Sequence, residues 1–249
     1  MSLAPSSTLD SAEVRRFARF ASEWWDPHGK FRQLHRLGPA RLTFIRDCLM
    51  RHFGRNAGDA RALAGLAVLD VGCGGGLISE PLARMGATLT AIDPAEENIE
   101  AARRHAEAQG LPINYRTGSA EDLVAEGASY DALVCLEVLE HVPNARAFLT
   151  TCASLLHPGG AMILSTINRT LKAYALAIVG AEYILRWLPA GTHQWERFIT
   201  PDELARDLAR TGLVPLEFRG LVYNPFADQW SLSADTDVNY LAAAAKPPR

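Results

Sequence analysis

The chain alternates short apolar runs with longer segments of helical periodicity. The apolar runs have the length and content of buried strands, and they lie at residues 66–71, 88–92, 113–117, 131–136 and 162–166. The helical segments between them lie at about residues 77–86, 96–109 and 144–156. Buried strands that alternate with helices predict an α/β fold, a mostly parallel Rossmann-like sheet with helices on both faces.

The first 60 residues add helices in front of this pattern. Residues 1–9 carry no periodicity, and we expect them to be disordered. One helix is predicted over residues 10–25, where apolar side chains recur on a single helical face, and a second over about 38–53. We interpret residues 10–60 as a helical lid on the domain that follows.

The C-terminal third completes the sheet. A helix is predicted at 201–211, and two strands at 214–219 and 238–244 are expected to finish a seven-stranded sheet as an antiparallel hairpin. Residues 168–198 are too long for an ordinary connection and are interpreted as a functional insertion that faces the substrate or a membrane. Residues 10–249 are therefore predicted to form one domain.

A glycine-rich loop follows the first strand, in the stretch VLDVGCGGG at residues 68–76. In such folds, a loop at the carboxyl edge of the sheet binds nucleotide-like ligands. Gly72 and Gly74 fit the start of a dinucleotide motif, but Leu77 stands where its third glycine belongs. Asp70 would repel a pyrophosphate and attract a cation. S-adenosylmethionine, a sulfonium without phosphate, suits this loop better than a nicotinamide dinucleotide.

The next two strands end in further candidates for the same ligand. Asp93 ends the second strand, 21 residues after Gly72, where a carboxylate can accept hydrogen bonds from ribose hydroxyls. Ala120 and Glu121 follow the third strand, within reach of an adenine ring. Each feature has a structural alternative, since Asp93 also suits a turn and Asp122 a helix cap. In this order and at these spacings, the set favours a methyl donor.

Composition narrows the class of protein. Hydrophobic residues make up 48% of the chain, and the formal net charge of −3 gives no general attraction to nucleic acid. No apolar run reaches the ~18 residues of a spanning helix, and no secretory signal is seen. No two cysteines form a C-x-x-C pair, which indicates reduced thiols in a cytoplasmic protein; they are Cys48, Cys73, Cys135 and Cys152.

Over residues 66–166 the chain resembles class I S-adenosylmethionine-dependent methyltransferases. Other stretches resemble the ubiquinone biosynthesis O-methyltransferase family more specifically, and these are WWDPHGKFRQLHRLGPARL, CLEVLEHVPN, STINRT, VGAEYILRWLPAGTH and DVNY. The resemblance implies that cofactor contacts fall on Arg41, Gly72, Asp93 and Leu136. It also implies a polyprenylated phenol or catechol as substrate, methylated in both O-methylation steps of the pathway.

Three polar side chains follow the fourth strand. Glu137, Glu140 and His141 would share one face if a helical turn began at Glu137, and two carboxylates with an imidazole can bind a divalent cation. The alternative is a metal-free site in which His141 is a general base and the glutamates cap or pair. The resemblance favours a metal, which we expect to be Mg²⁺. A bound cation would help to ionise a phenol of pKa ~10.

The insertion carries an apolar stripe over residues 171–188. Such a stripe is usually the core-facing side of a helix, but it can also lie in a bilayer interface. The resemblance implies substrates with membrane-resident tails, so we expect peripheral association with the inner face of the membrane. His193, just beyond, is a second candidate base. Enzymes of the same pathway are possible partners, and nucleic acid is not expected.

Three competing interpretations stay open on the residues alone. A class I methyltransferase for another small phenol would share the loop. A nicotinamide oxidoreductase is disfavoured by Asp70 and Leu77. A non-catalytic lipid-binding component of a biosynthetic assembly would account for the insertion and leave the cofactor loop without a use.

Overall fold

The computed structural model describes residues 11–56, 58–176, 178 and 194–248. The predicted disorder of residues 1–9, the greater part of the stripe at 171–188 and His193 lie outside these residues. Along the described chain, no helix is both long and apolar enough to cross a bilayer.

Eight strands form one sheet in the order β3-β2-β1-β4-β5-β8-β6-β7. Strands β1 to β5 run parallel, and β8 pairs antiparallel with both β5 and β6. Their bounds are β1 Ala67–Val71, β2 Thr88–Asp93, β3 Asn114–Thr117, β4 Tyr130–Leu136, β5 Leu156–Ile167, β6 Val214–Asn224, β7 Gln229–Ser233 and β8 Asn239–Ala245. This is the predicted α/β sheet, mostly parallel with antiparallel C-terminal strands.

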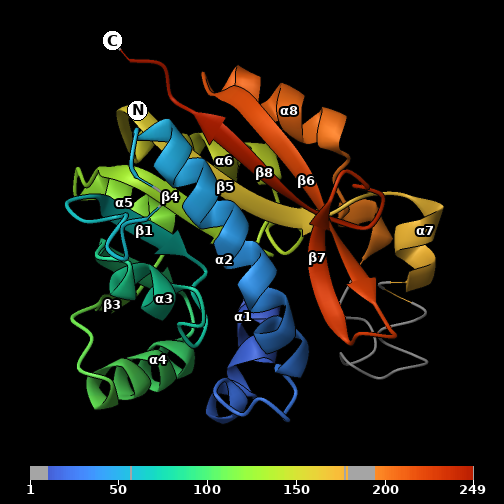
Figure 1. Ribbon diagram of the computed structural model, residues 1–249, viewed down its shortest axis with the longest axis horizontal. Coiled ribbons are helices and arrows are strands. Elements are labelled where there is room, and N and C mark those ends of the chain that lie inside the picture. The colour runs from blue at the N-terminus through green and yellow to red at the C-terminus, as the bar shows by residue number, and fades with distance from the viewer. Residues whose placement is uncertain (1–10, 57, 177, 179–193, 249) are drawn as a thin grey trace.

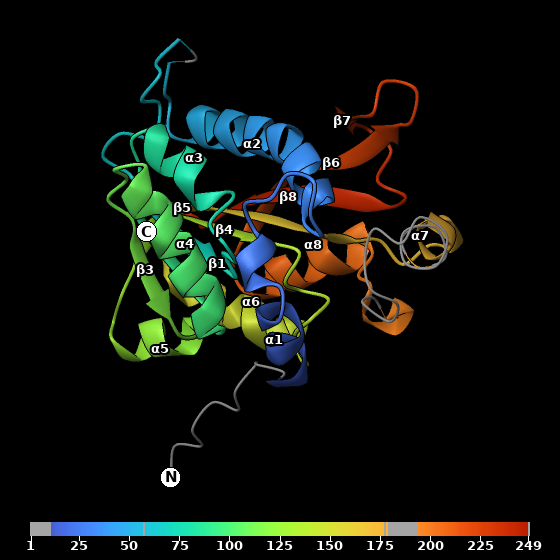
Figure 2. The same ribbon diagram turned by 90° about the horizontal axis from the view of Figure 1, so that it is seen from below.

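Helices cover both faces of the sheet (Figures 1 and 2). Leucines of α2 and α3 pack on one face, whereas apolar residues of α5, α6 and α8 pack on the other. The helices are α1 Ser11–Ala18, η1 Ala21–Glu23, α2 Arg32–His52, α3 Ser79–Arg84, α4 Glu96–Ala108, α5 Ala120–Ala125, α6 Ala145–Ser154, α7 Leu171–Ala173, η3 Trp195–Arg197 and α8 Pro201–Arg210.

Local sequence signals set where these helices begin. Ser119 and Asp122 form a reciprocal capping box at the start of α5, and Thr200 with Glu203 does the same for α8. Asn144 accepts a hydrogen bond from the backbone N–H of Ala147 and so caps α6. The cap interpretation of Asp122 is therefore confirmed.

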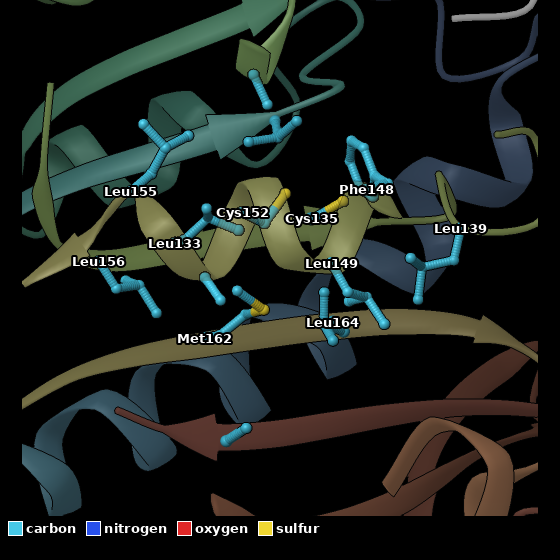
Figure 3. Packing of buried hydrophobic residues seen from close by; sticks show 14 of the residues in the cluster. Leu133, Cys135, Leu139, Phe148, Leu149, Cys152, Leu155, Leu156, Met162 and Leu164 are labelled. Carbon is cyan, nitrogen blue, oxygen red and sulfur yellow. The ribbon is translucent and has the colours of Figure 1, made fainter. Parts of the chain in front are cut away.

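One large part of the core lies between the central strands and α6 (Figure 3). Leu133 of β4 and Leu164 of β5 are fully buried, and they pack in one cluster with Phe148 and Cys152 of α6. Burial of such a side chain stabilises the fold by roughly 1.5–3 kcal/mol relative to exposure. All four cysteines are buried, and none of them forms a disulfide in the structure. This rigid centre fixes the carboxyl ends of β1 and β4, where the candidate residues lie.

Two elements differ from the sequence predictions. The sheet has an eighth strand, β7, because the short segment Gln229–Ser233 turns back along β6 after a loop at 225–228. The helix expected over residues 10–25 is interrupted after Ala18, and Trp24 turns onto the glycine loop instead of continuing the helix. Both departures bring side chains to the same edge of the sheet.

Candidate functional site

A cavity of about 830 Å³ opens at the carboxyl edge of the parallel strands. Each candidate site residue within the described chain lines it, namely Arg41, Asp70, Gly72, Gly74, Asp93, Ala120, Glu121, Leu136, Glu137, Glu140 and His141. These residues come from α2, from the carboxyl ends of β1, β2 and β4, and from the segments after β1, β3 and β4, which the parallel topology carries to one edge. Open α/β sheets bind their ligands at this edge.

The glycine loop is shaped by close approaches. Gly72 has φ 73°, and a Cβ there would lie 2.5 Å from Cγ2 of Val138. Gly74 has φ 53°, and its N–H donates to Oδ2 of Asp93 at 3.0 Å. Any larger residue at either position would meet both backbone strain and a steric clash. The loop therefore holds one tight path beside the cavity.

Asp93 has more structural bonds than the sequence suggests. Besides the bond from Gly74, its Oδ1 accepts from the backbone N–H of Ala95 at 2.9 Å and from Nδ2 of Asn98 at 3.1 Å. Burial raises the pKa of this carboxyl, and these three bonds act to lower it. A carboxylate offers about four acceptor positions, so about one remains for a ligand in the cavity.

Asp70 is a buried carboxyl at the end of β1. Burial raises its pKa to about 7, while a 2.6 Å hydrogen bond from Oγ of Ser79 acts to lower it and the charge of Asp93 raises it further. The ionised form lacks the water that it would have in the unfolded chain. A cationic ligand in the cavity would stabilise this ionised form.

Asp70→Asn should therefore stabilise the donor-free protein at pH 8. In the wild type, the pKa of Asp70 rises on folding from an ordinary 3.8 to about 7. The wild-type protein therefore loses, as the pH rises from 4 through 7, stability that it has below pH 4. The gain from Asp70→Asn should reach at most about 4 kcal/mol above pH 7 and vanish near pH 4. Thermal melts of both proteins at pH 4 and pH 8 measure it; an equal difference in melting temperature at both would contradict this account.

The segment after β4 does not begin with a helical turn. Glu137 has φ 55°, so the prediction that Glu137, Glu140 and His141 share a helical face is wrong. The physical reason is that Glu137 is still held to the sheet where β4 ends, because its backbone N–H donates to Ser165 of β5. The carboxylate turns to Arg41, whose guanidinium lies 2.8 Å away, and accepts from Oγ of Ser165 at 2.7 Å.

Glu140 and His141 lie deeper in the same segment. Oε2 of Glu140 accepts from Oγ1 of Thr166 at 2.8 Å, and Oε1 is buried without a hydrogen-bond partner in the described chain. Burial, together with the charge of Glu137, raises the pKa of Glu140 to about 7. Nδ1 of His141 lies 2.9 Å from Oε2 of Glu13, which α1 supplies.

The pKa of His141 follows its neighbours. Burial alone would lower it, but the hydrogen bond with Glu13 and the charge of Glu140 raise it above its ordinary value. Among the residues that the structure describes, no three His, Cys, Asp or Glu side chains are grouped as a metal would require.

The N-terminal segment covers the glycine loop. The indole of Trp24 lies against Gly74 and Gly75, where a Cβ would approach its ring to 2.4 Å and 2.3 Å. Nε1 of Trp24 donates to Asn98 at 2.8 Å, and Nε1 of Trp25 donates to the carbonyl of Gly75 at 2.9 Å. A side chain at position 74 or 75 would therefore clash with the ring of Trp24, so the packing of this ring also requires glycine there.

Comparisons with known proteins find a methyltransferase domain and methyltransferase relatives. A family model described as a methyltransferase domain matches residues 69–164. The ubiquinone biosynthesis O-methyltransferase of Parvibaculum lavamentivorans is 52% identical and aligns over 98% of this chain and 96% of its own. That of Azorhizobium caulinodans is 50% identical over 96% of this chain and 95% of its own.

Solved structures share the fold at lower identity. A magnesium protoporphyrin IX methyltransferase from Synechocystis, with bound SAH, has a TM-score of 0.63 at 22% identity and covers 94% of this chain and 93% of its own. A possible histamine N-methyltransferase from Thermotoga maritima has a TM-score of 0.64 at 15% identity and covers 94% of this chain and 99% of its own.

Proposed function

Because the chain belongs to the ubiquinone biosynthesis O-methyltransferase family, we propose that it methylates a catechol-type hydroxyl of polyprenylated ubiquinone precursors, in both O-methylation steps, with S-adenosylmethionine as donor. One observation carries this proposal. The loop and carboxylates suited to the donor share a cavity with the acidic residues suited to a phenol.

The donor is assigned to the part of the cavity beside β1 and β2. Asp93 accepts from a ribose hydroxyl there, and Asp70 faces the positive charge of the sulfonium and amine. Leu136 packs on the adenine, with Ala120 and Glu121 at its edge. The support for this assignment is that all these side chains line the cavity.

Arg41 is assigned to the carboxylate of the donor. Its side chain is buried, and its Nε has no hydrogen-bond partner in the described chain. The ion pair with Glu137 holds the guanidinium against the cavity wall. A guanidinium fixed in this way suits a carboxylate through paired N–H donors.

The acceptor must lose a proton before or during transfer. At pH 7 about one phenol in a thousand is ionised, given a pKa of ~10. Glu140 suits the role of proton acceptor, because its Oε1 is unpartnered in the described chain and its raised pKa lies near neutral. His141, held by Glu13, is the second candidate. The ionised oxygen then attacks the methyl carbon in line with the departing thioether sulfur.

As an alternative to the proton-acceptor role of Glu140, we propose a divalent cation, Mg²⁺ as the resemblance implies, held by Glu137, Glu140 and His141, which would have to regroup from the arrangement described above. The unpartnered Oε1 of Glu140 fits such a role, whereas Glu137 would have to leave Arg41 and Ser165. When bound, the cation would lower the pKa of the acceptor hydroxyl.

The test is methyl transfer from labelled S-adenosylmethionine to a short-tailed catechol by the purified protein, with and without chelator. We expect a methyl ether and stoichiometric S-adenosylhomocysteine, with loss of turnover in chelator and recovery with Mg²⁺. Donor binding without transfer to any catechol would refute the proposed function. Full turnover in metal-free protein would refute only the cation.

The membrane is a proposed partner through residues 171–188. Leu171 is 83% exposed and Leu176 55%, which supports an apolar surface at the start of this segment. Flotation with liposomes should recover the full chain and lose the variant without 171–188. Equal recovery of both proteins would contradict this surface.

We also propose that other enzymes of the pathway bind the chain, and that residues 10–60 act as a lid.

A further inference from the structure

The cavity extends from the glycine loop toward β6 and β7, at the other end of the strand order. There its walls are the first turns of α2, with Gln33 and Leu37, and the β6–β7 hairpin, with Leu221 and Trp230. In the strand order β7 is well separated from β1, but Leu136 at the end of β4 and Trp230 of β7 line the same cavity and pack on one core cluster, so this end of the cavity borders the end of β4. A donor held at β1 and β2 leaves this end of the cavity for another ligand.

Two side chains in these walls have unused hydrogen-bonding atoms. Nε2 and Oε1 of Gln33 and Nε1 of Trp230 are buried and have no partner within the described residues. Buried polar groups in native proteins are nearly always paired, and each unpaired one costs about 1–3 kcal/mol. Because both residues line the cavity, a ligand there can supply the missing partners.

The two walls are fixed against each other. Nη1 of Arg36 lies 2.6 Å from Oδ1 of Asp228 at the hairpin turn, and the hydroxyl of Tyr223 donates to the same oxygen at 2.5 Å. The ring of Tyr223 lies 5.3 Å from that of Trp230, centroid to centroid. The unpaired atoms of Trp230 and Gln33 therefore lie between two walls that these contacts connect.

The chemistry of the pocket selects its ligand. An indole N–H can only donate, so its partner is an oxygen acceptor, and the amide of Gln33 can both donate and accept. The surrounding wall is apolar, with Leu34, Leu37 and Leu221. A flat, mostly apolar ring that bears a few oxygens satisfies both conditions.

We infer that the pocket between α2 and the β6–β7 hairpin binds the acceptor ring, and that Trp230 and Gln33 recognise its ring oxygens other than the hydroxyl that is methylated. This inference rests on the proposed function and names the specificity-determining residues of the same site. Trp230 donates to a methoxy or carbonyl oxygen, and Gln33 pairs with a neighbouring oxygen.

The test compares two short catechols that differ by one ring methoxy group. We expect wild-type protein to prefer the methoxy-bearing catechol in kcat/KM by about tenfold, the worth of one hydrogen bond. Trp230→Phe keeps an aromatic side chain, although a smaller one, and removes the N–H donor, so this preference should fall to about one. The Kd of S-adenosylhomocysteine, measured by calorimetry, should stay unchanged.

Trp195→Phe is the matched control. Its Nε1 donates to the carbonyl of Thr170, and Trp195 does not line the cavity, so the wild-type preference should persist. A wild-type preference near one, or an equal preference in Trp230→Phe, would overturn the inference. So would a parallel loss of S-adenosylhomocysteine affinity. Failure of the wild type to methylate either catechol would refute the proposed function itself.

Discussion

Asp93→Ala should weaken binding of S-adenosylhomocysteine by roughly 10- to 150-fold, since a hydrogen bond to a charged group contributes about 1.5–3 kcal/mol. The loss has two sources. The variant removes the acceptor proposed for a ribose hydroxyl, and it frees the N–H of Gly74 and the side chain of Asn98, so the glycine loop loses its anchor. Calorimetric titration measures the dissociation constant.

Asp131→Ala is the control for this variant. Asp131 also accepts a backbone hydrogen bond, from Ala67 at 2.8 Å, but this bond lies at the start of β1, at the opposite edge of the sheet. It should lower stability without changing donor affinity. Wild-type affinity in Asp93→Ala would contradict the assignment of the donor to this end of the cavity.

Glu140→Gln should lower turnover by roughly 10²–10³-fold, the usual worth of a proton acceptor in a transition state. The same loss is expected if Glu140 binds a cation, because the amide is a poor ligand. Thr166 can still donate to the Gln oxygen, so the shape of the site is kept. Donor affinity should stay near wild type, since Glu140 is not assigned to the donor.

Stability separates this loss from unfolding. Burial raises the pKa of Glu140 to about 7, so the wild type pays to hold an ionised carboxyl there at pH 8, and Glu140→Gln should melt no lower than wild type. Turnover and thermal melts measure the two effects. Wild-type kcat in Glu140→Gln would remove Glu140 from the chemistry.

Strong local patterns in the sequence predicted the donor side of the site. An apolar strand, a glycine loop and an acidic residue at the end of the next strand meet at one edge through parallel topology, so the sequence alone predicts that Asp70, Gly72 and Asp93 lie together, as they do in the cavity. That they bind the donor stays a prediction. The sequence does not predict the structural bonds of Asp93, because those to Gly74 and Asn98 depend on the turn that follows β2.

The other side of the site depends on contacts between distant segments. Glu13 reaches His141 across 128 residues, and no spacing rule relates them. The predicted helical face at Glu137 failed because tertiary contacts with Ser165 and Arg41 override local periodicity. Strand β7, which supplies Trp230, is five residues long and weakly apolar, so its pattern resembles a loop. Pairing with β6 is what makes it a strand.

A crystal structure with S-adenosylhomocysteine and a short-tailed catechol tests the central claim most directly. The account predicts ribose at Asp93, the sulfur facing the end of β4, and a catechol hydroxyl beside Oε1 of Glu140. A catechol bound elsewhere, or S-adenosylhomocysteine absent from the cavity, would contradict it.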